Sequence, residues 1–159
     1  MAADHDHRYA TALAWSGSTG VGYEAYDRTH RVTAEDPSVE LVLASDPAFR
    51  GDPSCWNPEQ LLVASASSCQ LLSFLAVAAR ARLDVVDYRD QATAEMPAGD
   101  ELWIARIDLR PAVVLADTDR ARPSDERLAH LAEIAHRECF IARSLRSEVT
   151  VTPSFRWRS

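Results

Sequence analysis

One cysteine, Cys69, lies in the middle of the most apolar stretch of the chain, residues 57–72 (NPEQLLVASASSCQLL). Serines and a glutamine adjoin it (SASSCQ), and a small polar niche in an apolar segment suits a thiol that changes its chemical state. A thiol reacts as the thiolate, so its surroundings must favour the negative charge. Position 69 is about three turns inside the helix expected here, too deep for the helix N-terminus to act on it.

A cationic side chain must therefore come from elsewhere. The 17 basic residues are all arginine, which excludes Schiff-base and P-loop lysine chemistry. An arginine that stabilises a thiolate needs an acid to orient its guanidinium, and Glu59 at the helix start is a candidate for that role.

Three other roles are conceivable for these residues: packing, hydrolysis and metal binding. Free cysteine is often buried simply to fill space, so Cys69 can be a packing residue. A cysteine hydrolase would need His30, His130 or His136 beside the sulfur, and no nucleophile-elbow motif is present. His136 and Cys139 are three residues apart, but His130 falls on another helix face, so no metal site is expected.

The order of elements predicts an α+β domain with a mostly antiparallel sheet and a long buried central helix. Strands are expected at residues 9–15, 21–26 and 39–44, and a β-hairpin at 85–96 and 102–115. The central helix begins at an Asn57–Gln60 capping box and ends near residue 82. A second helix starts at residues 123–124, with an apolar stripe that includes Cys139 and Ala142. The last strand is expected at residues 147–155.

Composition limits the function classes. The 159 residues carry a formal charge of −7, so an acidic surface disfavours nucleic acid as a partner. The length predicts one domain spanning 1–159. The three unevenly spaced cysteines and a polar start (residues 1–8, expected to be a mobile tail) predict a cytoplasmic protein. Residues 61–79 contain four serines and a glutamine, so a buried helix is expected there and not a membrane span.

Two motifs resemble a known family. The run Asn57-Pro58-Glu59 is followed ten residues later by Cys69, and a second cysteine, Cys139, lies in a C-terminal helix before the last strand. This arrangement resembles the OsmC/Ohr family of thiol peroxidases over nearly the whole chain. Residues 45–56 (SDPAFRGDPSCW) and 139–145 (CFIARSL) resemble its OsmC-like branch. The chain departs from the family at Phe140, where a proline usually follows the second cysteine, and its effect on disulfide formation stays open.

The resemblance implies a cysteine-based reduction of organic hydroperoxides in an antioxidant stress response, without a cofactor. Cys69 matches the peroxidatic cysteine, which forms a sulfenate, and Cys139 matches the resolving cysteine, which forms a Cys69–Cys139 disulfide. Glu59 matches the conserved acid. Similar proteins are re-reduced by dithiols of the lipoyl type. Arg50 best matches the OsmC-type arginine.

Two arginines in an earlier segment, Arg28 and Arg31, match the Ohr-type arginine instead. Cys55, beside Trp56, matches no motif and is expected to be incidental. A non-catalytic relative that binds a hydrophobic small molecule or a partner protein remains the alternative from a different functional class.

The spacing of Glu59 and Cys69 also bears on assembly. In one straight helix, ten residues place the two side chains about 15 Å apart along the axis, too far to share a small pocket. Either the helix is broken between them, or Glu59 reaches the Cys69 of a second subunit. Pairing of the apolar helix across a two-fold axis predicts an intertwined homodimer with composite sites, as the resemblance also does.

Overall fold

The computed structural model describes residues 6–34 and 39–158. The chain forms two compact units, residues 1–61 and 62–159. Of the predicted N-terminal tail, residues 1–5 lie outside the described residues.

The N-terminal unit contains an antiparallel sheet of three strands, β1 (Thr11–Ala14), β2 (His30–Ala34) and β3 (Glu40–Leu43), in that order. The first and third predicted strands are confirmed, but the strand predicted at 21–26 is wrong. This segment holds a 3-10 helix, η1 (Thr19–Val21), followed by Gly22 with φ of 93°. That backbone conformation favours glycine and interrupts an extended strand, so the returning strand begins only at His30.

The central helix, α1 (Pro58–Arg80), runs without a break over 23 residues, after a short 3-10 helix η2 (Pro47–Phe49). Its predicted capping box is confirmed. The N–H of Gln60 donates to Asn57 Oδ1 at 2.8 Å, and the Asn57 N–H donates to Gln60 Oε1 at 3.1 Å. The helix ends where the Leu83 N–H bonds the Ala78 carbonyl at 2.9 Å, a reversal that closes the C-terminus two residues earlier than predicted.

The C-terminal unit contains two three-stranded sheets. One has the order β4 (Asp84–Asp90), β7 (Pro111–Ala116) and β9 (Ser154–Arg158). The other has the order β5 (Thr93–Glu95), β6 (Arg106–Leu109) and β8 (Glu148–Val151). The predicted hairpin is confirmed, because β4 pairs with β7 and β5 with β6, both antiparallel. The last segment, β8 and β9, pairs in parallel with β6 and β7, so the two C-terminal sheets are mixed. The other four strand pairings of the described residues are antiparallel, as predicted.

Each strand predicted as one long element is interrupted at the same level of the sheet. The breaks fall at residues 91–92, at Arg110 and at residues 152–153, next to one another in the register. Pro111 and Pro153 lie at these breaks and lack the N–H that a continuous ladder needs. The sequence pattern of alternation does not show such a break, which explains the longer prediction.

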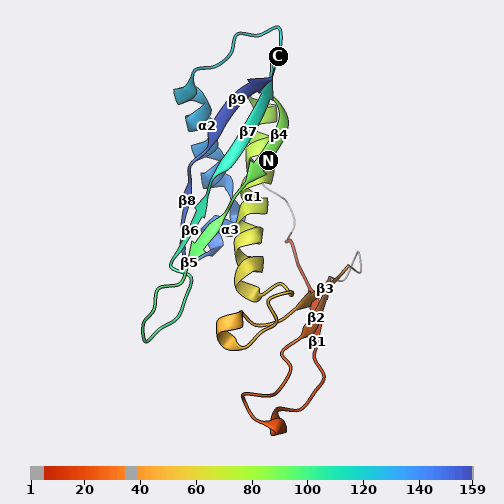
Figure 1. Ribbon diagram of the computed structural model, residues 1–159. Coiled ribbons are helices and arrows are strands. Elements are labelled where there is room, and N and C mark those ends of the chain that lie inside the picture. Colours follow the sequence, from red (N-terminus) through yellow and green to blue (C-terminus); the bar gives the residue numbers. More distant parts are fainter. Residues whose placement is uncertain (1–5, 35–38, 159) are drawn as a thin grey trace. The chain divides into compact units, whose positions relative to one another are not determined.

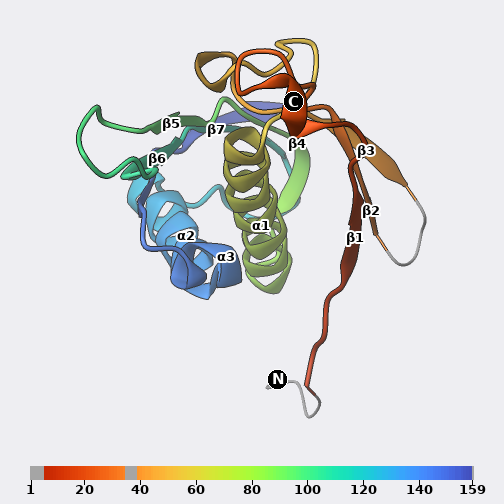
Figure 2. The same ribbon diagram turned by 90° about the horizontal axis from the view of Figure 1, so that it is seen from below.

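Two further helices complete this unit, α2 (Asp125–Glu138) and α3 (Phe140–Ser144). Ser124 caps α2 as expected, since its Oγ accepts from the Arg127 N–H at 3.3 Å. Figures 1 and 2 show α1 and α2 side by side on one face of the sheets. Their apolar faces form the core with the sheet; the buried members are Phe74, Val77, Ala78, Val113, Leu115, Leu128, Leu131, Ala132 and Ala135.

The other face of α1 is exposed in the single chain; the predicted burial of this face requires a second subunit and stays a prediction. Ala64, Ser68, Leu72, Ala76 and Ala79 recur at helical spacing along this exposed face, and Leu72 is 64% exposed. By length and composition, α1 is apolar enough to cross a membrane. Its most apolar stretch of 18 residues has a mean hydropathy of 1.8, and 28% of that stretch is buried. The core helix of a soluble protein meets the same criterion, and α1 covers a sheet with its buried face.

Asp90, at the end of β4, joins α1 to the sheet. Its carboxylate accepts a hydrogen bond from Ser67 Oγ at 2.5 Å and another from the Arg110 N–H at 2.7 Å. We expect Asp90→Ala to lower the free energy of unfolding by about 2 kcal/mol, because both donors lose a charged acceptor. Urea unfolding measures the change.

Asp87, on the same strand, provides a matched control. It pairs with Arg89 at the surface, so Asp87→Ala should change the free energy of unfolding by less than about 0.5 kcal/mol. Equal destabilisation by the two substitutions would contradict a joining role for Asp90.

Candidate active site

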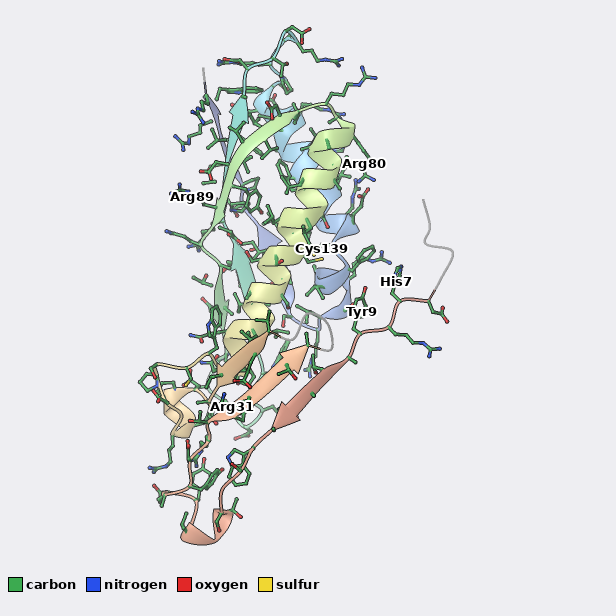
Figure 3. The ribbon with its side chains drawn as sticks, turned by 90° about the vertical axis from the view of Figure 1, so that its right-hand side faces the viewer. His7, Tyr9, Arg31, Arg80, Arg89 and Cys139 are labelled. Carbon is green, nitrogen blue, oxygen red and sulfur yellow. The ribbon has the colours of Figure 1, made fainter. Side chains whose placement is uncertain are left out.

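Two cysteines meet where α1 faces the junction of α2 and α3. Cys69 is half-buried on α1, and Cys139 is 1% exposed between the two C-terminal helices. Figure 3 shows Cys139 beside the middle of α1. The two thiols are free, and both sulfurs lie at the start of α3. Seventy residues of sequence separate them, so the tertiary fold, and no local motif, brings the sulfurs together.

The start of α3 presents backbone donors to both sulfurs. The Ile141 N–H donates to Cys69 Sγ and the Ala142 N–H donates to Cys139 Sγ, each at 3.5 Å. Cys139 is the N-cap of α3, and its own N–H bonds the His136 carbonyl at the end of α2. The predicted single stripe through Cys139 and Ala142 is therefore wrong, because the helix breaks at Cys139 to form a cap.

The N-terminus of α1 is far from Cys69, as predicted, but the start of α3 supplies a backbone donor that the sequence did not predict. A signal was present in Cys139-Phe140-Ile141-Ala142, since a small side chain with an acceptor atom before an apolar run is typical of a helix cap. Phe140 occupies the first position of α3 and is 74% exposed. The short helix thus forms without the proline that favours this position.

The two sulfurs are held in different surroundings. Burial of Cys139 raises its pKa to about 11, and the neighbouring Cys69 thiol contributes to this rise. The N–H groups of Ala142 and Ile141 partly offset the rise, since they favour the thiolate. At neutral pH, Cys139 is accordingly a protonated thiol.

This pKa predicts a pH dependence of stability. The folded chain holds the Cys139 proton more tightly than the unfolded chain does, so the stabilisation is complete below the unfolded pKa and is lost as the pH rises toward about 11. Relative to Cys139→Ala, the wild type should lose roughly 2 kcal/mol of unfolding free energy over this alkaline range. Urea titrations at several pH values measure the difference. A constant difference between the two proteins across that range would contradict it.

Two of the serines near Cys69 donate hydrogen bonds to the helix backbone and to the sheet. Ser67 donates to Asp90, and Ser65 Oγ donates to the Leu62 carbonyl of its own helix at 2.7 Å. The unpartnered polar atoms in this region belong to two other residues. Gln70 is 1% exposed and Tyr88 is half-buried, and neither Gln70 Oε1 nor the Tyr88 hydroxyl has a hydrogen-bond partner among the described residues.

Glu59 and Arg50 are described within the N-terminal unit. Glu59 lies in the first turn of α1, and its Oε2 is buried without a hydrogen-bond partner among the described residues. Arg50 follows η2 with φ of 67°, forms an ion pair with Glu24, and lies 6.0 Å from the ring centre of Tyr23. The buried Glu59 oxygen, which has no donor in residues 6–34 and 39–158, thus follows closely in sequence the loop that carries the predicted arginine.

The two alternative arginines have local partners. The guanidinium of Arg28 lies 3.9 Å from the ring centre of Tyr26 and 4.9 Å from that of Tyr23, and it donates to both tyrosine carbonyls. Arg31 forms an ion pair with Glu40 on the neighbouring strand. Arg28 thus stabilises its own loop, and Arg31 connects two neighbouring strands of the sheet.

The remaining candidates show no further site in the described residues. No group of three or more His, Cys, Asp or Glu side chains able to hold a metal is present in the ranges 6–34 and 39–158. In the same ranges, the hydrogen bonds to Cys69 and Cys139 include no histidine side chain. Cys55 is half-buried and free.

Comparisons with known proteins agree with this fold. Residues 51–154 match the protein family described as OsmC-like protein. A search of the curated proteins returns no match. Among solved structures, an OsmC-like protein of unknown function from Vibrio cholerae is similar, with 25% identity and a TM-score of 0.83, covering 94% of this chain and 100% of its own.

Two more distant structures share the fold. One is the organic hydroperoxide resistance protein OsmC from Legionella pneumophila, with 18% identity, a TM-score of 0.64, and coverage of 94% of this chain and 98% of its own. The other is a putative organic hydroperoxide resistance protein from Vibrio cholerae with captopril bound in one of the active sites. It has 22% identity and a TM-score of 0.64, and the match covers 96% of this chain and 95% of that one.

Proposed function

Because this chain belongs to the OsmC-like protein family, we propose that it is a thiol-dependent peroxidase that reduces organic hydroperoxides. The observation that carries the proposal is the convergence of two free thiols, Cys69 and Cys139, on the start of α3, where each sulfur accepts a hydrogen bond from a backbone N–H. Some structures with this fold are named organic hydroperoxide resistance proteins, which supports the same chemistry.

The proposed reaction begins at Cys69. Its thiolate sulfur attacks the outer oxygen of the hydroperoxide, the O–O bond breaks, and the alkoxide leaves and takes a proton to become the alcohol. Sulfur loses two electrons and the peroxide gains them. The Ile141 N–H at 3.5 Å stabilises negative charge on Cys69 before the attack, as a donor in a water-poor site does.

The second step uses Cys139 as the resolving thiol. Its sulfur attacks the sulfenic sulfur of Cys69, the S–S bond forms, and the S–O bond breaks. Because Cys139 is protonated at neutral pH, its proton leaves with the hydroxide as water, and no external base is needed for the balance. A dithiol reductant, of the lipoyl type by family resemblance, then returns the pair to the reduced state.

Glu59 and an arginine supply the charge in this proposal. Burying a carboxylate oxygen without a hydrogen-bond donor is energetically unfavourable, so we expect Glu59 Oε2 to pair with a cationic side chain. A guanidinium can bind a carboxylate with two parallel hydrogen bonds. We assign that role to Arg50, whose loop leads into α1, with Arg28 and Arg31 as alternatives already engaged in local contacts. The guanidinium would stabilise the thiolate and the leaving alkoxide.

An unbroken α1 favours a homodimer with shared sites. Since Pro58–Arg80 is one continuous helix, Glu59 and Cys69 of one chain are about 15 Å apart along its axis. The exposed apolar face of α1 offers the surface on which a second copy of α1 would pack. In this arrangement Glu59 of one subunit serves Cys69 of the other. We further propose that residues 1–159 form one OsmC-like domain and that the protein is cytoplasmic.

Turnover of hydroperoxides tests the proposal. The purified chain is supplied with cumene hydroperoxide or hydrogen peroxide and with dihydrolipoamide, and alcohol formation is followed. We expect multiple turnovers, with the organic peroxide reduced faster, because Ile141, whose N–H donates to Cys69, packs in an apolar cluster with Ala66 of α1. Absence of turnover with either peroxide and any dithiol would reject a peroxidase.

A further inference from the structure

In the described residues of the C-terminal unit, three buried side-chain atoms have no hydrogen-bond partner. One is Nδ1 of His136, on α2; the other two are the hydroxyl of Tyr88, on β4, and Oε1 of Gln70, on α1. Leaving a buried donor or acceptor without a partner is unfavourable, and native structures have few of them. Tyr88 and Gln70 can together pair with a group that has both a hydrogen-bond acceptor and a donor.

The register of α1 against β4 places these atoms at one level. Ser67 of α1 bonds Asp90 of β4, and one to two turns later Phe74 packs against Tyr88 with ring centres 6.1 Å apart. Gln70 lies between Ser67 and Phe74 on the buried face of the helix. Its amide is therefore enclosed between α1 and the sheet at the level of Tyr88.

The same level contains the sulfurs. Gln70 follows Cys69 directly on α1, and consecutive N–H groups of α3, those of Ile141 and Ala142, donate to the sulfurs of Cys69 and Cys139. The Tyr88 hydroxyl is close enough to Cys139 for charge on that sulfur to act on it, and burial together with this charge and that of Asp90 raises the pKa of Tyr88 well above its ordinary value. Tyr88 therefore stays protonated throughout the physiological range and can donate a hydrogen bond.

The two atoms complement a hydroxyl group. Tyr88 offers an O–H donor and Gln70 offers a carbonyl acceptor. A sulfenic acid, S–O–H, presents an oxygen that accepts and an O–H that donates, whereas a reduced thiol has only a weak S–H donor. Resting on the proposed function, we propose that Tyr88 and Gln70 hold the Cys69 sulfenic acid, with Tyr88 donating to the sulfenyl oxygen and Gln70 accepting its O–H.

This role orients the sulfur for the second step. With the oxygen held by Tyr88 and Gln70, the S–O bond is the one that breaks when Cys139 attacks, and the departing hydroxide receives the Cys139 proton beside two hydrogen-bonding groups. The pair also shields the sulfenic acid from a second peroxide, which would oxidise it to the sulfinic acid. Neither group exchanges electrons or enters a covalent bond.

The lifetime of the sulfenic acid tests the inference. In a Cys139→Ser background, excess hydrogen peroxide generates the sulfenic acid, and dimedone trapping after a delay, read by mass spectrometry, measures how long it survives. We expect Tyr88→Phe and Gln70→Leu each to shorten the lifetime about tenfold, with sulfinic acid accumulating in its place. Tyr9→Phe and Gln91→Leu, which make the same changes at exposed positions, should leave the lifetime unchanged.

Melting temperature provides a second readout that distinguishes folding from function. In the reduced protein, Tyr88→Phe removes a buried hydroxyl without a partner and should raise the melting temperature by about 2–4 °C. After conversion to the sulfenic acid, the order should reverse, because only the parent keeps the hydrogen bond from Tyr88. A purely structural tyrosine would shift both states equally.

The outcomes separate this inference from the proposed function. Equal sulfenic acid lifetimes in the variants and the parent, or no sulfenic acid on Cys69 under excess hydrogen peroxide, would overturn the inference. The proposed function is judged instead by turnover of organic hydroperoxide in the wild type. Shortened lifetimes in both variants, without such turnover, would support the inference and reject the peroxidase.

Discussion

Replacing Cys69 with serine is expected to reduce hydroperoxide turnover by about a thousandfold or more, because a serine hydroxyl at this position has neither the nucleophilicity nor the redox states of a thiolate. The substitution exchanges sulfur for oxygen and leaves the volume nearly unchanged, so the fold should persist. Alcohol formation from cumene hydroperoxide with dihydrolipoamide as reductant measures the loss.

Two cysteine variants serve as controls for this result. Cys139→Ser should retain the first reduction of peroxide in a single turnover and then stop with Cys69 as a sulfenic acid, because no resolving thiol is present. Cys55→Ser should turn over at the wild-type rate, since Cys55 matches neither the peroxidatic nor the resolving cysteine of the family. Wild-type turnover by Cys69→Ser would show that the chemistry lies at another residue.

Replacing Glu59 with glutamine is expected to reduce turnover about a hundredfold or more, because the arginine that stabilises the thiolate loses its orienting carboxylate. The predicted sharing of sites between subunits makes a stronger test possible. Dimers are purified with a different tag on each chain, so that one chain carries Glu59→Gln and the other carries Cys69→Ser. One site of such a dimer combines an unaltered Glu59 with an unaltered Cys69, and about half of the wild-type activity should return.

A reciprocal dimer provides the control. It joins a wild-type chain to a chain that carries both Glu59→Gln and Cys69→Ser, so that each shared site lacks one of the two groups. We expect this dimer to be nearly inactive. The opposite pattern, with an active reciprocal dimer and an inactive mixed dimer, would show that Glu59 acts on the Cys69 of its own chain.

Local sequence signals predicted the parts of the fold that depend on local chemistry. The capping box at Asn57 and Gln60 has its predicted hydrogen bonds, and Ser124 caps α2 as expected. Both depend on hydrogen bonds between residues three apart, which a sequence displays directly. The hairpin that flanks residues 97–101 was recognisable for the same reason, because its arms alternate on either side of a turn.

The parts that were missed depend on contacts between distant segments. The residues at 21–26 have strand-forming side chains, but Gly22 and the stacking of Tyr23 and Tyr26 on Arg28 hold them in turns. The alternation of apolar and polar residues cannot show that β8 and β9 pair in parallel with their neighbours, because a strand has the same alternation in parallel and antiparallel pairs.

The candidate site shows the same division. The family resemblance predicted Cys69 and Cys139, and the structure places both sulfurs at the start of α3. The donors at the sulfurs come from the backbone of Ile141 and Ala142, which no side-chain pattern reveals. Tyr88 was part of a predicted strand, and its closeness to the sulfurs follows only from the register of β4 against α1.

The central claim is that Cys69 is oxidised by an organic hydroperoxide and then captured by Cys139. Intact-mass and peptide mass spectrometry after one equivalent of cumene hydroperoxide tests it most directly. The account predicts that the reduced protein loses the mass of two hydrogen atoms and yields a peptide pair joined through Cys69 and Cys139. An unchanged mass, or an oxidised protein in which Cys69 is still a free thiol, would contradict it.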